Sequence, residues 1–152
     1  MNLALPDGSQ ATSDLNWKTF IQSIQNGTWN PVSTSTTPPT VSSGSLTYQA
    51  YWSTSGQNLI NFNIQIIVPS AATLTWPVNG YLQLPKLAGV ISSSVSGTVQ
   101  TALFPVHKVG SAAVAGYVEI SQPTNTAILI NTGGAFTSTS NLSIQGFYFI
   151  GK

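Results

Sequence analysis

Cysteine and arginine are both absent from this chain of 152 residues, and charged side chains make up only 5% of it. Without cysteine there are no disulfides, no thiol catalysis and no thiolate metal sites. Without arginine, and with only four lysines, the chain cannot neutralise a phosphate backbone, which excludes nucleic-acid binding. No polybasic segment or basic amphipathic helix is present for an anionic membrane surface.

Long apolar runs are absent as well. No stretch of about 18 apolar residues occurs, so we expect no membrane insertion. The first residues lack a basic region followed by an apolar core, so we expect no cleaved secretion signal.

The residues that are present indicate a folded domain rather than a disordered chain. Hydrophobic residues make up 41% of the sequence and aromatic residues 10%, while the net charge is only +1. Serine and threonine together number 38, so uncharged polar side chains must form most of the surface. A surface with so little charge repels other copies weakly. We therefore expect a single-domain subunit that assembles with other subunits.

The N-terminal part, residues 1–26, is expected to be an arm followed by an attachment helix. Residues 1–12 favour an extended arm, and residues 13–26 favour a helix capped by Ser13 or Asp14 and ended by Gly27. One face of that helix carries Trp17, Phe20, Ile21 and Ile24. These side chains either cover the rest of the same chain or form an assembly interface with neighbouring subunits.

The remainder, residues 27–152, is predicted to be all-β. The clearest strand is 58–68, where Ile60, Phe62 and Ile64 alternate with polar residues. Asn79-Gly80 predicts a tight turn, and Pro105 predicts an edge position or a bulge. Further strands are expected at 45–52, 73–76, 81–84, 90–94, 98–109, 113–120, 126–131 and 142–150. About nine short strands favour an antiparallel β-sandwich with a jelly-roll-like arrangement.

The last of these strands is apolar on both faces. It contains Phe147, Tyr148, Phe149 and Ile150 in succession. Such a strand either lies centrally, buried on both sides, or packs one face against a second copy. On the second interpretation Phe147 and Phe149 join the assembly interface.

Catalytic residues are scarce, so we do not expect an enzyme. The only histidine is His107, and the only acids that could orient it are Asp7, Asp14 and Glu119. Three acids are too few for a paired-carboxylate glycosidase, and no cluster of metal ligands is visible. We therefore expect no cofactor and no metal.

Aromatic residues at predicted strand ends and turns are candidates for a sugar-binding platform. They are Tyr51, Trp52, Trp76 and Tyr81. Aromatic faces stack on sugar rings, and amide side chains bond hydroxyl groups. The alternative is that these rings pack in the core or in an interface.

Four segments, taken in order, resemble a β-domain that recurs at the ends of tailed-phage fibre proteins. Residues 27–32 resemble its opening G-T-W-T-P-x, and residues 51–60 resemble Y-x-K-I-G-x-x-V without the lysine. Residues 80–85 resemble G-x-L-x-L-P, and residues 143–148 resemble its last strand, I-x-G-x-Y. The likeness covers residues 27–150.

The resemblance implies a homotrimeric, non-enzymatic domain on the virion surface. Fibres usually carry a long shaft before this domain, whereas only 26 residues precede it here. The expectation is therefore a short tail fibre or fibre tip, with other virion proteins and a bacterial surface glycan as partners. A trimeric decoration protein that stabilises the capsid is the alternative.

Overall fold

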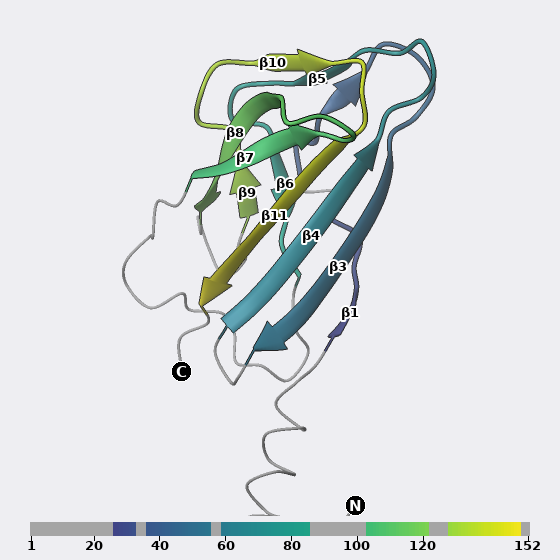
Figure 1. Ribbon diagram of the computed structural model, residues 1–152. Helices are drawn as coiled ribbons and strands as arrows, with labels where there is room; N and C mark the ends of the chain where they lie inside the picture. Colours follow the sequence, from purple (N-terminus) through teal and green to yellow (C-terminus); the bar gives the residue numbers. More distant parts are fainter. Residues whose placement is uncertain (1–25, 33–35, 56–58, 86–102, 122–127, 150–152) are drawn as a thin grey trace, which may run out of the picture.

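The computed structural model describes residues 26–32, 36–55, 59–85, 103–121 and 128–149, and every regular element among them is a β-strand (Figure 1). The strands are β1 (Asn26–Thr28), β2 (Thr40–Val41), β3 (Thr47–Ser55), β4 (Leu59–Ile67), β5 (Leu74–Trp76), β6 (Tyr81–Gln83), β7 (Leu103–Lys108), β8 (Val114–Ser121), β9 (Ile128–Ile130), β10 (Phe136–Ser138) and β11 (Leu142–Phe149). Every pair of neighbouring strands is antiparallel, so the all-β antiparallel prediction is confirmed.

The strands form two sheets around one core. The large sheet has the order β1-β3-β4-β11-β7-β8-β9-β6, and the small sheet has the order β10-β5-β2. The large sheet curls into a half-barrel, and the small sheet lies across one end of it (Figure 1). The fully buried Trp76 of the small sheet packs with Ile64 and Val118 of the large sheet in one cluster. The inner face of the large sheet is therefore its apolar face.

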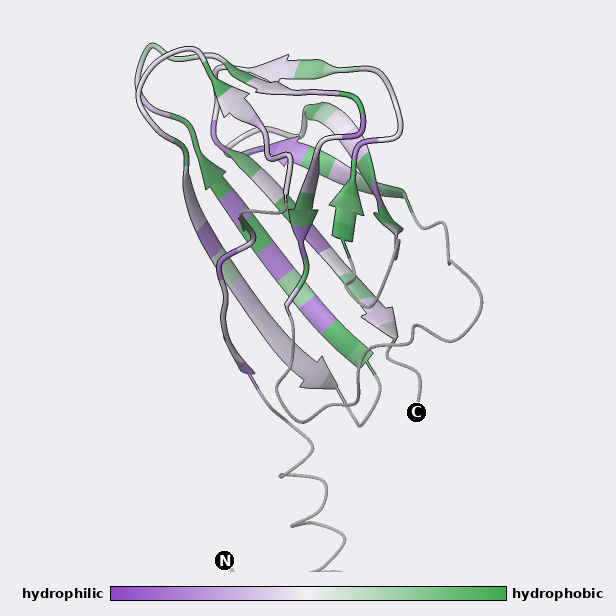
Figure 2. Cartoon of the chain, turned by 180° about the vertical axis from the view of Figure 1, so that it is seen from behind, coloured by the Kyte–Doolittle hydropathy of each residue, from purple (hydrophilic) through white to green (hydrophobic). Residues whose placement is uncertain are grey.

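Strand β4 shows why these residues form a sheet with two different faces. Its side chains alternate between buried and half-buried along the whole strand, as the sequence predicts. Ile60, Ile64 and Ile66 point inward, whereas Asn63 and Gln65 point outward. Figure 2 shows this alternation as green and purple bands along the long strands.

Strand β11 lies in the middle of the large sheet, between β4 and β7. Its Gly146 is required by packing, because a Cβ there would lie 2.5 Å from both Phe62 and Phe104. In the adjacent β7, Pro105 lies opposite Tyr117 of β8, and the register shifts only after Val106, where Ala115 of β8 has no partner. The irregularity therefore lies near Pro105 but not at it, and β7, which pairs with β11 through His107 and Lys108, is not an edge strand.

The tight turn at Asn79-Gly80 is confirmed, but it joins strands of different sheets. The Gly80 amide donates to the Pro77 carbonyl at 3.1 Å, and Asn79 has a φ of 62°, a value that asparagine tolerates. Strand β5 before the turn belongs to the small sheet, and β6 after it belongs to the large one.

Asn131 holds this crossing in place from the end of β9. Its side-chain nitrogen donates to the carbonyls of Trp76, Pro77 and Gly134, and its Oδ1 accepts from the Gly133 amide. The side chain is only 1% exposed. A buried amide with all its bonds satisfied fixes the geometry around it.

Other predictions need correction or fall outside the described residues. The predicted arm and helix lie outside them, except Asn26, which begins β1 instead of ending a helix. The strand predicted at 90–94 also lies outside them. Strand β3 continues to Ser55, beyond the predicted end at residue 52, because it pairs with β4 as far as Leu59. Strands β1, β2 and β10 were not predicted. Within the described ranges no helix could span a membrane.

Candidate functional site

The outer face of the large sheet carries a patch of neutral polar side chains, which we call the amide patch. On β4 it contains Asn61, Asn63 and Gln65, on β11 it contains Ser143 and Gln145, and on β3 it contains Gln49, Tyr51 and Ser53; the exposed Phe147 lies at its border. The register aligns them in three rows, since Asn63 lies opposite both Tyr51 and Gln145. Alternation along three neighbouring strands therefore brings five amide side chains together on one face.

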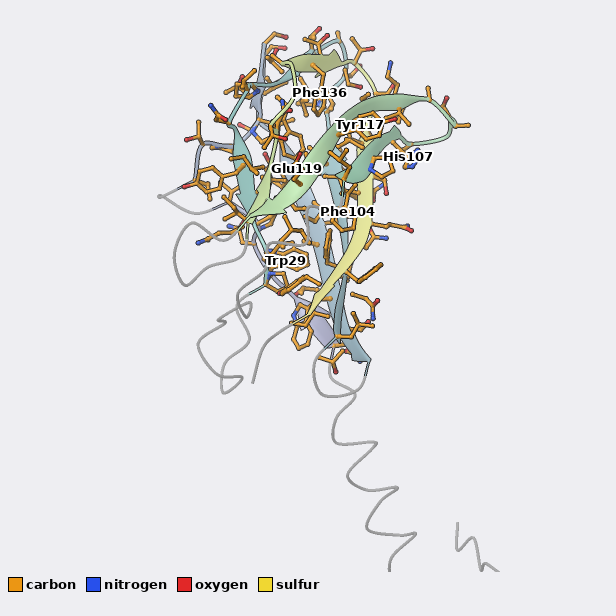
Figure 3. The ribbon with its side chains drawn as sticks, turned by 90° about the vertical axis from the view of Figure 1, so that its left-hand side faces the viewer. Trp29, Phe104, His107, Tyr117, Glu119 and Phe136 are labelled. Atoms are coloured by element: carbon orange, nitrogen blue, oxygen red, sulfur yellow. The ribbon has the colours of Figure 1, made fainter. Side chains whose placement is uncertain are left out.

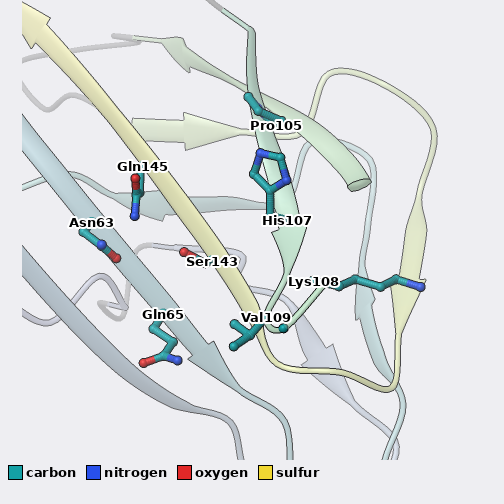
Figure 4. Close-up of a pocket in the computed structure, with 9 residues that line it drawn as sticks. Asn63, Gln65, Pro105, His107, Lys108, Val109, Ser143 and Gln145 are labelled. Atoms are coloured by element: carbon teal, nitrogen blue, oxygen red, sulfur yellow. The ribbon is translucent and has the colours of Figure 1, made fainter. Parts of the chain in front are cut away.

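Two hollows open on this face and share Asn63 and Gln145 in their linings. The larger, of about 650 Å³, extends from these residues to Gln65, His107 and Lys108 (Figure 4). The smaller, of about 400 Å³, extends the other way to Tyr51. Together they cross strands β3, β4, β11 and β7.

The polar atoms in these hollows are open to a ligand. Within the described part of the chain, no hydrogen bond uses the side chains of Asn63, Gln65 or Gln145. An amide offers two donor hydrogens and an oxygen with two lone pairs. Asn63, Gln65 and Gln145 therefore present open donors and acceptors, and no carboxylate is among the described residues that line the two hollows.

The four aromatic residues predicted as a sugar platform do not lie together. Tyr51 is 55% exposed on the outer face, beside the smaller hollow. Trp52 also lines the smaller hollow, but it is half-buried and packs against the core, and Tyr81 lies on β6, at the far end of the sheet order from β3. The prediction is wrong for Trp76, which is fully buried and donates through its indole to the Gly80 carbonyl at 2.9 Å.

The predicted assembly residues are only partly described. Trp17, Phe20, Ile21 and Ile24 lie outside the described residues, and so does the side chain of Phe149. Phe147 is 49% exposed on the outer face, while the neighbouring Tyr148 is buried and donates to the Pro85 carbonyl at 3.0 Å. The apolar strand end is therefore buried on its inner face and partly open on its outer face.

His107 and Glu119 do not form a catalytic pair. Glu119 lies opposite Leu103, four residues along β7 from His107, which is roughly 13 Å of strand (Figure 3). The Glu119 carboxylate accepts a hydrogen bond from the Thr132 hydroxyl at 2.7 Å. Among the described residues no three histidine, aspartate or glutamate side chains gather as a metal site.

The segments that carry the family resemblance contact one another. A Cβ on Gly27 would lie 3.0 Å from the Trp52 indole, so glycine allows the close approach of β1. The Trp29 indole donates to the Gln83 carbonyl at 2.8 Å, and the Gln83 amide donates to the Pro31 carbonyl at 2.8 Å. The bond from Tyr148 to Pro85 adds the last segment to this set.

Sequence reasoning missed the amide patch as a site, although its signal was visible. The alternation in strand 58–68 predicts only that its polar residues share one face. Their pairing with Gln145 and Tyr51 needed the register. No family model, curated protein or solved structure matches this chain, so its function is argued from its own residues.

Proposed function

We propose that this chain is a non-enzymatic structural protein on the virion surface of a tailed phage, of the short tail fibre or fibre-tip type. Its expected partners are other copies of itself, other virion proteins and a bacterial surface glycan. The proposal extends to the finer fold, a jelly-roll-like sandwich in which the small sheet closes one end of the curled large sheet.

One observation carries the proposal: the four segments that resemble the fibre domain lie far apart in sequence and contact one another. Gly27 packs on Trp52, Trp29 bonds Gln83, and Tyr148 bonds Pro85. These contacts agree with the single domain over residues 27–150 that the resemblance implies.

Assembly into a homotrimer is supported by the surface. Charged residues are only 5% of the chain, and Leu103 and Phe147, on neighbouring strands, are 60% and 49% exposed. Exposed apolar side chains on a surface without charge repulsion favour association. We propose that residues 1–26 attach the domain to the rest of the virion.

The absence of catalysis is supported by the isolation of the one histidine. His107 has no carboxylate partner among the described residues, and Glu119 is engaged with Thr132. Turnover of a glycan or peptide that His107→Ala abolishes would contradict a non-enzymatic role.

The test is to locate the chain in intact particles of the phage that encodes it. Immunogold labelling with antibodies against the purified domain should mark the tail or its tip. Label on the capsid would replace the fibre role with the decoration role, and absence from purified particles would overturn the proposal. Native mass spectrometry should give the mass of a trimer. A monomer both in solution and in particles would contradict the proposed trimeric assembly.

A further inference from the structure

The amide patch has the chemistry of a recognition surface rather than of an ordinary solvated sheet face. It combines amide side chains on three strands with the exposed ring of Tyr51, and it contains no carboxylate. Edge and surface strands usually carry charged residues, which keep them soluble and unpaired. Here uncharged hydrogen-bonding groups occupy those positions.

Two hollows give the patch relief in which a ligand can lie. Their volumes are about 650 and 400 Å³, and both open broadly to solvent, so a ligand lying in them would stay partly exposed. Asn63 and Gln145 line both hollows, so one ligand lying across the strands would contact both side chains at its centre. Neither amide has a partner among the described residues that a ligand would need to displace.

Aromatic rings lie at both ends of the row that Asn63 and Gln145 form across the strands. Tyr51 is on β3, and Tyr117, which is 54% exposed, lies on β8 opposite Pro105 of the larger hollow. Four strand spacings separate β3 from β8, roughly 19 Å along the sheet. The row is therefore long enough for several linked rings, with an aromatic face at each end.

We propose that the amide patch binds a neutral oligosaccharide, lying across β3, β4, β11 and β7. Asn63 and Gln145 each donate to and accept from sugar hydroxyls, which are themselves donors and acceptors. Tyr51 packs its ring against the apolar C–H face of a pyranose. The inference rests on the proposed function, because a domain on the virion surface would contact bacterial surface glycans.

The charges around the patch favour a neutral ligand. Lys108 and the exposed His107 line one end of the larger hollow, and no charged side chain lines the smaller one. A polyanionic glycan would need several cations along its path, and the row does not supply them.

A second copy of the chain fits the patch less well than a sugar. The cores of interfaces between copies are apolar, and unpaired amides buried there would lose hydrogen bonds to water. Sugar hydroxyls both donate and accept, so they can form hydrogen bonds with the amides in place of those to water. The apolar side chains suited to self-assembly, Leu103 and Phe147, lie beside the centre of the patch rather than in it.

The experiment uses the full-length chain on an array of neutral oligosaccharides from bacterial O-antigens and capsules, with sialylated and uronic-acid glycans as the charged comparison. The strongest neutral glycan is then titrated by calorimetry. The double variant Asn63→Ala/Gln145→Ala should lower its affinity at least about tenfold, the loss expected from two ligand hydrogen bonds. Tyr51→Ala should lower it by a similar factor.

Thr47→Ala is the matched control, because Thr47 is an exposed polar residue on the same strand as Tyr51 but lies outside the amide patch and lines neither hollow. It should bind as the original chain does. No binding to neutral glycans at millimolar concentration, or binding that the Asn63 and Tyr51 variants leave unchanged, overturns the proposal. A double variant that dissociates the oligomer shows that a second copy occupies the patch, which also overturns it.

The two proposals fail separately in these measurements. Specific glycan binding by a chain absent from virions would refute the virion role and keep the site. A chain located in virions whose patch binds no neutral glycan would keep the role and refute the site.

Discussion

The two faces of β4 differ in how deeply their side chains are buried and in the chemistry of those side chains. On the inner face Ile64 and Ile66 are completely buried, and on the outer face Asn63 and Gln65 are half-buried with open polar atoms. Burial of the inner side chains stabilises the sheet, by about 1.5–3 kcal/mol for each large apolar residue. The outer side chains add little to stability and are free to bind. In one strand, alternate residues therefore carry stability and, in our proposal, recognition.

The sharpest test of this division places the same charge on adjacent residues. Ile64→Asp buries a carboxylate without a partner, and we expect a loss of several kcal/mol, comparable with the whole stability of a domain this size. Gln65→Asp, one residue further along the strand, should cost about 1 kcal/mol or less. Urea denaturation followed by circular dichroism measures both. Equal effects would show that the two faces are not distinct.

A second test compares a buried amide with an open one. Asn131→Ala removes the two N–H donors that three carbonyls share and the acceptor of the Gly133 amide, and should cost about 3 kcal/mol. Asn63→Ala, in the amide patch, should change the free energy of unfolding by about 0.5 kcal/mol. The same denaturation experiment measures the difference. A mild Asn131 variant would mean that the turn from β5 to β6 holds without it.

A third test uses pH, because burial on the inner face alters tyrosine ionisation. Burial raises the pKa of Tyr48 from 10.0 to about 12, and it raises the pKa of Tyr148 further. The unfolded chain therefore loses these protons first as the pH rises. Stability is fully retained below pH 10 and declines from there toward pH 12.

Melting temperatures measured across this alkaline range should show the decline. Tyr48→Phe and Tyr148→Phe should each make it shallower, since phenylalanine has no proton to lose. Tyr148→Phe should also lower stability at neutral pH, because it removes the bond to the Pro85 carbonyl. A decline that the double variant leaves unchanged would assign the effect to other groups.

The smallest expected effect comes from a single bond between two of the motif segments. Trp29→Phe keeps most of the aromatic volume but removes the hydrogen bond to the Gln83 carbonyl. We expect a loss of about 1 kcal/mol in unfolding free energy, the usual net value of one such bond. Glycan binding at the amide patch should be unchanged. A loss of glycan affinity in this variant would couple the motif contacts to the outer face.

Only part of the candidate site could be predicted from the sequence. Tyr51 and the polar positions of β4 could be identified from local pattern, because alternation is a property of one strand. Gln145 could not be joined to them, since it is more than 80 residues away and reaches Asn63 only through strand pairing. The prediction for Trp76 is wrong for the same reason. A position beside a turn does not indicate that this side chain packs in the core, with its ring centroid 5.6 Å from that of Phe136.

By itself the sequence determined that this protein is all-β, that β4 has one apolar face, and that the chain turns at Asn79-Gly80. These features follow from side-chain periodicity and backbone preference within a few residues. Only the tertiary structure decided that β5 and β6 belong to different sheets, that β1, β2 and β10 are strands, and that five amides share one face. Those features depend on pairing between distant segments, which is selected by the packing of the whole core and not by any local pattern.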